Sequence, residues 1–314
     1  IYPKSFCDTN NDGLGDLRGV IEKLDYIKEL GVDYIWLTPF FVSPQNDNGY
    51  DVEDYYNIDP RYGTMADVEE LIDEGKKRGI GLMFDMVFNH VSTRHEWFRK
   101  AMDGDPYYKD FFFFRKGKGK GVPPTNWESK FGGNAWEYVE KFDEYYLHLF
   151  DVTQADLNWD NENVRKEIQK IVRFWMDKGV RGFRFDVVNL ISKAAFEDDE
   201  TGDGRKYYTD GPNIHKYLKE LHDMTFGTNA EIITVGEMSS TSIENCYQYA
   251  GADTGELFMV FSFHHLKVDF MGNEKWVLVP ADFGKLKKII FEWQTKMAEH
   301  NAWNAVFWCN HDQP

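Results

Sequence analysis

The sequence predicts an α/β fold in which parallel strands alternate with helices, and three observations support it. Short β-branched and aromatic runs alternate with longer amphipathic segments along most of the chain. These runs are apolar at nearly every position, which is typical of strands covered by helices on both faces. One stretch, 91–160, interrupts the alternation. We therefore expect a parallel sheet with one insertion.

The expected elements follow in chain order. The runs predicted as strands are Ile1–Phe6, Val32–Leu37, Ile80–Val87, Val180–Val187, Ile232–Glu237, Leu257–Phe263 and Ala305–Asn310. The predicted helices are Leu17–Leu30, Met65–Arg78, Glu162–Lys178, Asn213–Thr225, Ser242–Ala250 and Phe283–Glu299. One more strand would close a (β/α)8 barrel, the TIM barrel. A doubly wound open sheet is the alternative, although the Gly-x-Gly-x-x-Gly fingerprint of its dinucleotide-binding form is absent after the first strand.

The stretch 91–160 is rich in aromatic residues and glycines, including Phe111–Phe114, Trp127 and Trp136. It is too long for a structureless loop in a compact domain. Its aromatic content also conflicts with a disordered linker. We expect a subdomain inserted after the third strand, with the barrel formed by 1–90 and 161–314.

Composition argues against several classes of protein. The 314 residues include 53 acidic and 36 basic side chains, for a formal net charge of −17. This balance disfavours a general nucleic-acid binder or a surface that docks on anionic lipid. No apolar run approaches the ~20 residues of a membrane span. The widely spaced Cys7, Cys246 and Cys309 predict buried reduced thiols, so we expect a cytoplasmic protein without nucleic-acid or membrane partners.

Three acidic residues fall at the carboxyl ends of predicted strands, which is where barrel enzymes place their chemistry: Asp186, Glu237 and Asp312. A single acidic residue there is more often a helix N-cap, but three are harder to explain that way. Glycosidic cleavage needs one protonated carboxyl group that donates to the leaving oxygen and one ionised carboxylate that attacks. Arg184, on the same side of the strand as Asp186, is placed to keep that aspartate ionised.

Four segments carry a resemblance to a known family: 85–90 (DMVFNH), 182–186 (GFRFD), 235–237 (VGE) and 310–312 (NHD). They resemble, in order, the signature segments of the α-amylase family of glycoside hydrolases. The resemblance implies a (β/α)8 barrel with a subdomain after the third strand. It also implies that the C-terminal part of the barrel, and any C-terminal β domain, lie outside this chain.

The resemblance also assigns roles by position. It makes Asp186 the nucleophile, Glu237 the general acid/base and Asp312 the residue that stabilises the distorted sugar in the transition state. The residues that would bind the sugar before the scissile bond are His90, Arg184 and His311.

The segment 47–50 (DNGY) resembles one that closes the pocket around the non-reducing glucose in the α-glucosidase branch of the family. Asp47 would hold sugar hydroxyls and Tyr50 would stack on the ring. The same residues are strong turn formers, so a simple turn is the alternative. That branch also uses a pocket arginine that would lie beyond residue 314.

The segment 8–16 (DTNNDGLGD) places oxygen-bearing side chains at alternate positions, which suits Ca²⁺ or Mg²⁺. Its residue pattern matches that of an EF-hand loop over nine positions, but the twelfth position, where an EF-hand has a bidentate glutamate, is Gly19. A polar turn without metal is the alternative. In the α-glucosidase branch the similar loop binds one structural metal, and no organic cofactor is expected. The implied ligands are Asp8, Asn10, Asp12, Asp16 and the carbonyl of Leu14.

Two lysines, Lys267 and Lys275, lie near two histidines in a strongly acidic chain and could bind a phosphoryl group. Singly, such lysines are usually solvated. The segments around them, with 208–212 and 236–241, resemble α-glucosidase-branch members that hydrolyse trehalose 6-phosphate.

The implied protein is a retaining α-glucosidase, a monomer or weak oligomer, that acts on a small phosphorylated disaccharide. It would release glucose and glucose 6-phosphate through a covalent glucosyl-aspartate. One alternative is an oligo-1,6-glucosidase acting on isomaltose-type substrates, or a related transglucosylase. Another, from a different class, is a non-catalytic partner subunit of a transporter.

Overall fold

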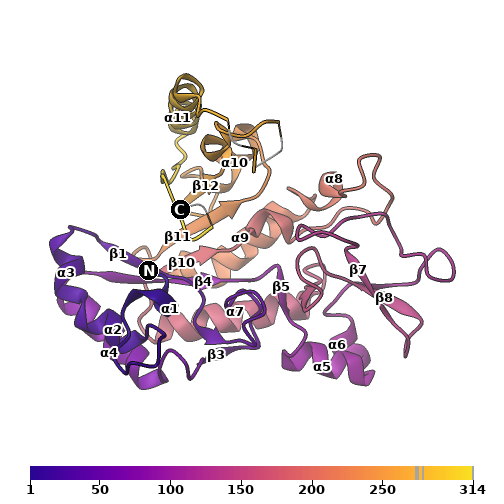
Figure 1. Ribbon diagram of the computed structural model, residues 1–314, viewed down its shortest axis with the longest axis horizontal. Coiled ribbons are helices and arrows are strands. Elements are labelled where there is room, and N and C mark those ends of the chain that lie inside the picture. Colours follow the sequence, from indigo (N-terminus) through magenta and orange to yellow (C-terminus); the bar gives the residue numbers. More distant parts are fainter. Residues whose placement is uncertain (273–275, 278, 313–314) are drawn as a thin grey trace.

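The computed structural model describes residues 1–272, 276–277 and 279–312. A five-stranded parallel sheet, in the order β1-β4-β10-β11-β12, runs through its centre (Figure 1). Its strands are β1 (Tyr34–Leu37), β4 (Gly81–Met86), β10 (Gly182–Phe185), β11 (Ile233–Met238) and β12 (Met259–Ser262). The spatial order follows the chain order without the reversal of a doubly wound sheet. The sheet is therefore part of the wall of a (β/α)8 barrel.

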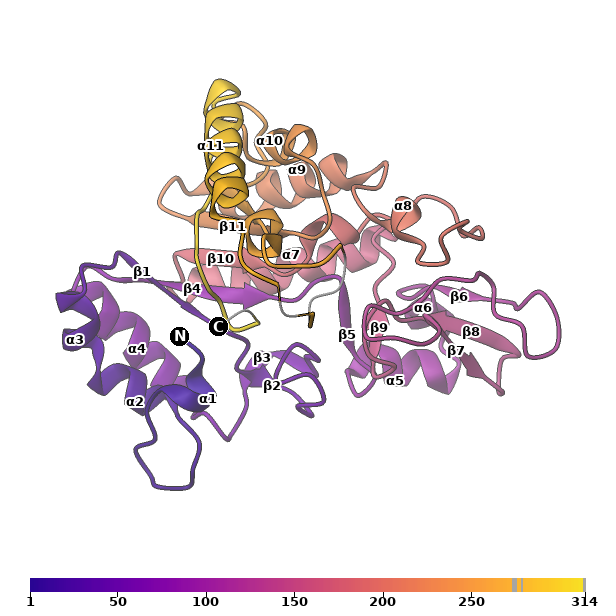
Figure 2. The same cartoon turned by 45° about the horizontal axis from the view of Figure 1, so that its top comes forward.

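Helices connect these strands and cover the outer face of the sheet (Figure 2). They are α2 (Leu17–Glu22), α3 (Leu24–Glu29), α4 (Met65–Lys77), α7 (Glu162–Asp177), α9 (Ile214–Met224), α10 (Ile243–Ala250) and α11 (Phe283–Glu299). Helix α4 begins at a capping box, in which the side chains of Thr64 and Asp67 each accept from the other's backbone N–H. The local sequence thus sets where this helix begins.

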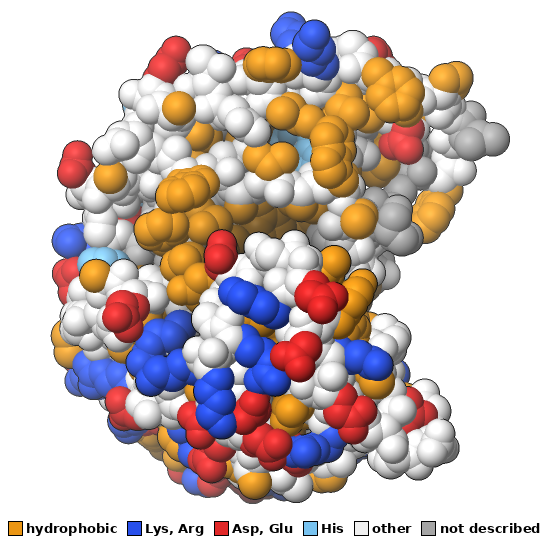
Figure 3. Space-filling model, turned by 90° about the vertical axis from the view of Figure 1, so that its left-hand side faces the viewer, with side chains coloured by type: hydrophobic (Ala, Val, Ile, Leu, Met, Phe, Trp, Pro, Cys, Tyr) orange, Lys and Arg blue, Asp and Glu red, His pale blue; other side chains and the backbone are white. Residues whose placement is uncertain are grey.

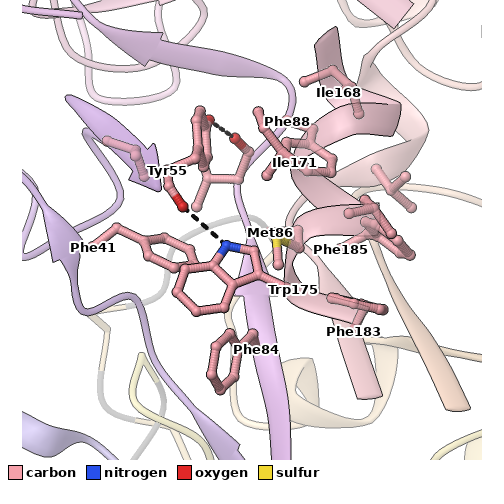
Figure 4. Packing of buried hydrophobic residues seen from close by; sticks show 14 of the residues in the cluster. Phe41, Tyr55, Phe84, Met86, Phe88, Ile168, Ile171, Trp175, Phe183 and Phe185 are labelled. Carbon is pink, nitrogen blue, oxygen red and sulfur yellow. Dashed lines mark hydrogen bonds between the residues drawn. The ribbon is translucent and has the colours of Figure 1, made fainter. Parts of the chain in front are cut away.

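The main core lies between the sheet and helix α7 (Figure 4). Phe84 of β4 contacts Trp175 of α7 edge to face, with ring centroids 5.1 Å apart. The indole of Trp175 is fully buried and donates to the carbonyl of Tyr55 at 2.9 Å. A buried tryptophan needs such a partner for its N–H, and this bond ties α7 to β3 (Asp54–Ile58), the strand that contains Tyr55.

Side chains alternate across the strands. While Phe84 faces α7, the flanking Met83 belongs to a second cluster with Val235 and Phe261. A space-filling view shows hydrophobic side chains gathered in a hollow of the surface (Figure 3). The charged residues of the site described below occupy the same alternate positions as Met83 and Val235, nearer the carboxyl ends of the strands.

The stretch after β4 carries a separate set of strands. Strands β5 (His90–Ser92) and β9 (Gln154–Asp156), at its two ends, pair antiparallel, and β6 (Phe114–Arg115), β8 (Glu144–Leu147) and β7 (Trp136–Val139) form a small sheet. Helices α5 (Glu96–Asp103) and α6 (Pro106–Lys109) lie beside them. Trp127 and Trp136 are buried in a cluster that includes Tyr208, from the loop after β10. The aromatic content therefore supplies a core, which a disordered linker would not have.

The remaining short elements lie in the connections. They are α1 (Pro3–Phe6), β2 (Phe41–Val42), β3 (Asp54–Ile58), η1 (Val188–Leu190), α8 (Arg205–Tyr208), η2 (Phe226–Thr228) and η3 (His264–Lys267). Among the described residues, no helix is both long and apolar enough to cross a bilayer.

Some sequence predictions are wrong in detail. Residues 3–6 form the helical turn α1, with Pro3 at its start, instead of a strand. Within this segment, Ile1 makes backbone hydrogen bonds of the kind found between strands: its amino group donates to the Trp36 carbonyl, and its carbonyl accepts from the Thr38 N–H. The segment 305–310 forms no strand, and its neighbour Asn304 makes a single parallel bridge to Val260. The prediction of three buried thiols is also wrong, because only Cys246 is buried while Cys309 is exposed.

Candidate active site

Four charged residues meet at the carboxyl ends of three neighbouring strands. Asp85 lies in β4, Arg184 in β10 and Glu237 in β11, and Asp186 directly follows β10. The register pairs Arg184 with Asp85 on one side and with Val235 on the other. Residues that share a strand face point into the same space. The carboxyl ends of the sheet therefore collect three acidic groups around one arginine.

The guanidinium of Arg184 holds this cluster together. Its Nη1 donates to Asp85 at 2.8 Å and to Asp186 at 2.6 Å, and its Nη2 donates to Glu237 at 2.7 Å. The Arg184 side chain is only 2% exposed. Short charge-assisted bonds of this kind fix both the position and the orientation of a carboxylate. The sequence prediction that Arg184 contacts Asp186 is confirmed, and the structure adds Glu237 to the same cation.

Burial sets the protonation of these carboxyl groups. It raises the pKa of Glu237 to about 7 and that of Asp186 to about 6, while the positive charge of Arg184 opposes both shifts. A hydrogen bond between the two side chains acts in opposite directions, raising the pKa of Glu237 and lowering that of Asp186. Of the two groups, Glu237 therefore keeps its proton to higher pH, and Asp186 is the one that ionises first.

The third predicted carboxylate is placed differently. The side chain of Asp312 is 61% exposed and lies 3.5 Å from Nε2 of His311. It follows the irregular segment 305–310 and does not join the Arg184 cluster. His311 itself reaches inward, with its Nε2 2.9 Å from the Tyr50 hydroxyl and its ring stacked on the Tyr50 ring.

The predicted sugar-binding residues lie beside the cluster. The Tyr50 hydroxyl donates to Asp85 at 3.0 Å, and the Tyr50 carbonyl lies 3.1 Å from Nε2 of His90. Burial lowers the pKa of His90 to about 4, so its ring is neutral. Gln154 of the inserted stretch donates to Asp47 at 2.8 Å, and burial raises the pKa of Asp47 to about 6. These groups form one hydrogen-bonded wall next to Asp186.

Sequence reasoning assigned no role to three residues of this wall: Asp85, Gln154 and Trp36. Trp36 donates its indole N–H to Asp85 at 3.2 Å, and its ring lies 5.0 Å from the Arg184 guanidinium carbon. Asp85 could have been found, because it occupies an inward position at the end of a predicted strand. Gln154 carried no local signal, since its partner Asp47 is 107 positions away in the chain.

Of the residues predicted to bind a phosphoryl group, the structure describes Lys267 and the two histidines before it. His264 is 2.8 Å from the Thr241 carbonyl and His265 is 2.7 Å from the Phe307 carbonyl, so the backbone engages both rings. Lys267 is exposed at the end of η3, and Lys275 lies outside the described residues.

The predicted metal loop is an ordered, hydrogen-bonded turn. Asp8 accepts backbone N–H groups from Asn10, Asn11 and Gly13, and Asp12 accepts from Leu14. Asp16 is turned away: one oxygen caps α2 at Gly19 N and the other accepts from Thr9. Within 1–272, 276–277 and 279–312, no three His, Cys, Asp or Glu side chains converge as metal ligands. As arranged here, the ligand set is incomplete without Asp16, and the metal remains a prediction.

A cavity of about 820 Å³ lies at the other end of the sheet, lined by Ile232, Thr234, His222, Trp303 and neighbouring residues. Ile232 and Thr234 lie at the start of β11, whereas Glu237 lies near its carboxyl end, so this cavity is on the side of the sheet away from the carboxylates.

Comparison with known proteins agrees with this geometry. The chain matches the family described as "Alpha amylase, catalytic domain" over residues 1–314. It is 57% identical over 316 residues to trehalose-6-phosphate hydrolase of Bacillus subtilis (strain 168), covering 100% of this chain and 56% of that protein. It is 48% identical over 323 residues to oligo-1,6-glucosidase of Bacillus cereus, covering 100% of this chain and 57% of that protein.

A solved structure is equally similar. The crystal structure of Bacillus licheniformis trehalose-6-phosphate hydrolase superimposes with a TM-score of 0.97 at 58% identity, covering 100% of this chain and 57% of that one. The chain thus spans little more than half the length of the relatives it matches. By both sequence and fold, the chain belongs to the α-amylase family of glycoside hydrolases.

Proposed function

We propose that the whole protein is a retaining α-glucosidase that hydrolyses trehalose 6-phosphate to glucose and glucose 6-phosphate. The observation that carries the chemistry is the sharing of Arg184 between Asp186 and Glu237. One cation holds two carboxyl groups at one strand edge, and the higher pKa of Glu237 makes it the group that keeps its proton. Retaining cleavage requires a charged carboxylate and a protonated carboxyl group that act on the same glycosidic linkage.

The proposed reaction has two steps. The carboxylate of Asp186 attacks the anomeric carbon and forms a covalent glucosyl ester, while Glu237 gives its proton to the departing oxygen of glucose 6-phosphate. A water molecule then attacks the same carbon, and Glu237 takes a proton from it. The bond to Asp186 breaks, glucose leaves with retained configuration, and both carboxyl groups return to their starting states.

The unphosphorylated glucose would bind against the wall formed by Asp47, Tyr50, His90, Arg184 and His311. The phosphorylated half would lie outward, toward Lys267 at the end of η3 and, as the sequence predicts, Lys275. The names of the relatives support this substrate, because two proteins more than 55% identical to the chain are called trehalose-6-phosphate hydrolases. Asp312 would stabilise the transition state only if substrate or the rest of the protein brought it inward.

One second candidate has a specific observation in its favour. The 48% identity to oligo-1,6-glucosidase makes isomaltose-type substrates the close alternative. The whole protein should therefore be assayed on trehalose 6-phosphate, trehalose, isomaltose and p-nitrophenyl α-glucoside. We expect kcat/KM to be highest for trehalose 6-phosphate, and a higher value for isomaltose would reject the proposed substrate.

The catalytic assignment has its own test. The variants Asp186→Asn and Glu237→Gln should each lose activity by about 10³-fold or more while keeping the far-UV circular dichroism of the parent. An active Asp186→Asn variant would reject the covalent mechanism.

A further inference from the structure

One lysine of the inserted stretch reaches the edge of the site without having been assigned any role. Lys130 is partly buried, and its Nζ donates to Oγ of Ser239 at 3.3 Å. Its Nζ also lies 5.4 Å from the centre of the Tyr208 ring. A lysine ammonium has three donor hydrogens, so one long bond to a hydroxyl leaves donor capacity for a ligand.

The partner of this lysine is itself held in place. Ser239 follows β11 directly, and its backbone N–H and carbonyl both bond to the side-chain amide of Asn189, at 2.9 Å each. The side chain of Asn189 is fully buried and also donates to Asp210. The hydroxyl of Ser239 is thus presented at a fixed point above the strand that carries Glu237.

The charge state of Lys130 depends on its surroundings. Burial and, after it, the positive charge of Arg205 at the start of α8 lower the pKa of Lys130 to about 8. The acidic groups that act on Lys130 are Asp203, which pairs with Arg205 at 3.2 Å, and Glu237 and Asp156. Lys130 remains mostly charged at neutral pH. In a chain of net charge −17, Lys130 forms a local positive site of the kind that attracts anions.

The spacing of this positive site fits a phosphorylated leaving sugar. Ser239 is two residues beyond Glu237 along an extended chain, which corresponds to about 7 Å. Glu237 would protonate the oxygen between the two sugars, and a phosphate on C6 of the leaving glucose lies one sugar ring away from that oxygen. An anion on that carbon would therefore reach Ser239 and Lys130 while the linkage stays at Glu237.

We propose that Lys130, together with the Ser239 hydroxyl, binds the phosphate of the departing sugar. This inference rests on the proposed function, because it names the part of the same site that selects a phosphorylated substrate. It adds a cation from the inserted stretch, on different elements from Lys267. In this arrangement the insertion contributes to substrate selection as well as to folding.

The test compares a phosphorylated with a neutral substrate in three variants. Lys130→Met should raise KM for trehalose 6-phosphate at least about tenfold, since the variant loses a charge-assisted bond to the phosphate. KM for p-nitrophenyl α-glucoside should change less than about twofold. Lys130→Arg should recover most of the loss, because it restores the charge. The matched control Lys120→Met, at an exposed lysine of the same insertion, should change neither value.

Two outcomes would overturn the inference: an equal loss on both substrates, or no loss on trehalose 6-phosphate. If Lys130→Met does not fold, Ser239→Ala serves instead, with an expected KM increase confined to the phosphorylated substrate. Inorganic phosphate should inhibit the parent on p-nitrophenyl α-glucoside more strongly than it inhibits Lys130→Met. A parent that cleaves isomaltose but not trehalose 6-phosphate would reject the proposed function itself, a result distinct from any change in the variants.

Discussion

Arg184 contacts both oxygens of Asp85 through a single nitrogen, Nη1, at 2.8 and 3.1 Å. Both side chains are essentially buried, and Asp85 also accepts from Tyr50 and Trp36. Asp85 thus supplies a countercharge that holds the guanidinium in the orientation in which it reaches Asp186 and Glu237. A buried ion pair of this kind is costly to break, because the remaining charge is left without compensation.

Replacing that countercharge should weaken both stability and activity. Asp85→Asn keeps an acceptor oxygen but removes the charge, so we expect the free energy of unfolding to fall by about 3 kcal/mol. Urea unfolding measures the stability, and kcat on p-nitrophenyl α-glucoside, which should also fall, measures the alignment. The control Asp25→Asn breaks an exposed pair with Arg78 and should cost less than about 1 kcal/mol. Equal stability of the two variants would contradict this account of Asp85.

The pH dependence of activity should be bell-shaped. Below about pH 6, Asp186 gains a proton and ceases to be a nucleophile, so the rate falls on the acid side. Above about pH 7, Glu237 loses the proton that it must donate, so the rate falls on the alkaline side. Because the two groups interact, the acid and alkaline limbs of the profile give apparent pKa values that belong to the pair and not to either residue alone. This bell-shaped profile is tested by measuring kcat/KM from initial rates between about pH 4 and pH 9. A flat profile from pH 5 to pH 9 would contradict it.

The buried amine of Lys193 should stabilise the junction between the barrel and the inserted stretch. Its Nζ bonds to Asp156 at 2.8 Å, Asn89 at 2.8 Å and the Leu190 carbonyl at 2.7 Å, and the side chain is fully buried. Lys193→Met would leave the buried carboxylate of Asp156 unpaired, at an expected cost of about 3–5 kcal/mol.

Thermal and urea unfolding check this expectation. Combining Lys193→Met with Asp156→Asn should recover part of the loss, because the uncompensated charge disappears. Lys170→Met, at an exposed pair with Glu167, is the control and should have little effect. A double variant less stable than Lys193→Met alone would show that the charge is not the cause.

The loop 8–16 should bind one Ca²⁺ or Mg²⁺ ion if Asp16 can turn from its helix cap toward Asp8 and Asp12. Ca²⁺ at about 100 times its dissociation constant would then add about 2.7 kcal/mol of stability over the protein in EDTA. Calorimetry with and without Ca²⁺ measures the difference, and Asp12→Ala should abolish it. Identical melting temperatures of the parent in EDTA, Ca²⁺ and Mg²⁺ would leave the loop as a polar turn.

Much of the fold could be predicted because its signals are local. The continuous apolar runs around Phe84 and Phe183 predicted strands covered on both faces, and the structure confirms β4 and β10 there. The same reasoning failed at Pro3, where the fixed φ of proline favours the start of a helical turn. It also failed at 305–310, where hydrophobic residues form no ladder beyond the bridge at Asn304.

The candidate site was predictable to the extent that strand ends are predictable. Asp186 and Glu237 follow apolar runs, and parallel strands bring their carboxyl ends to one edge, so their proximity could be expected. The roles of Gln154 and Lys130 could not be inferred in this way. Each acts on a partner more than 100 positions away, across the contact between the inserted stretch and the barrel.

The alternation of strands and helices, the insertion and the two acidic residues at neighbouring strand ends could be inferred from the residues alone, because periodicity and chain order are local properties of the chain. Which acidic groups surround one positive charge became known from the folded arrangement. Burial raises the pKa of Glu237, and one guanidinium connects three carboxyl groups from three strands. Desolvation and electrostatic pairing depend on distances through space, which the order of residues along the chain does not specify.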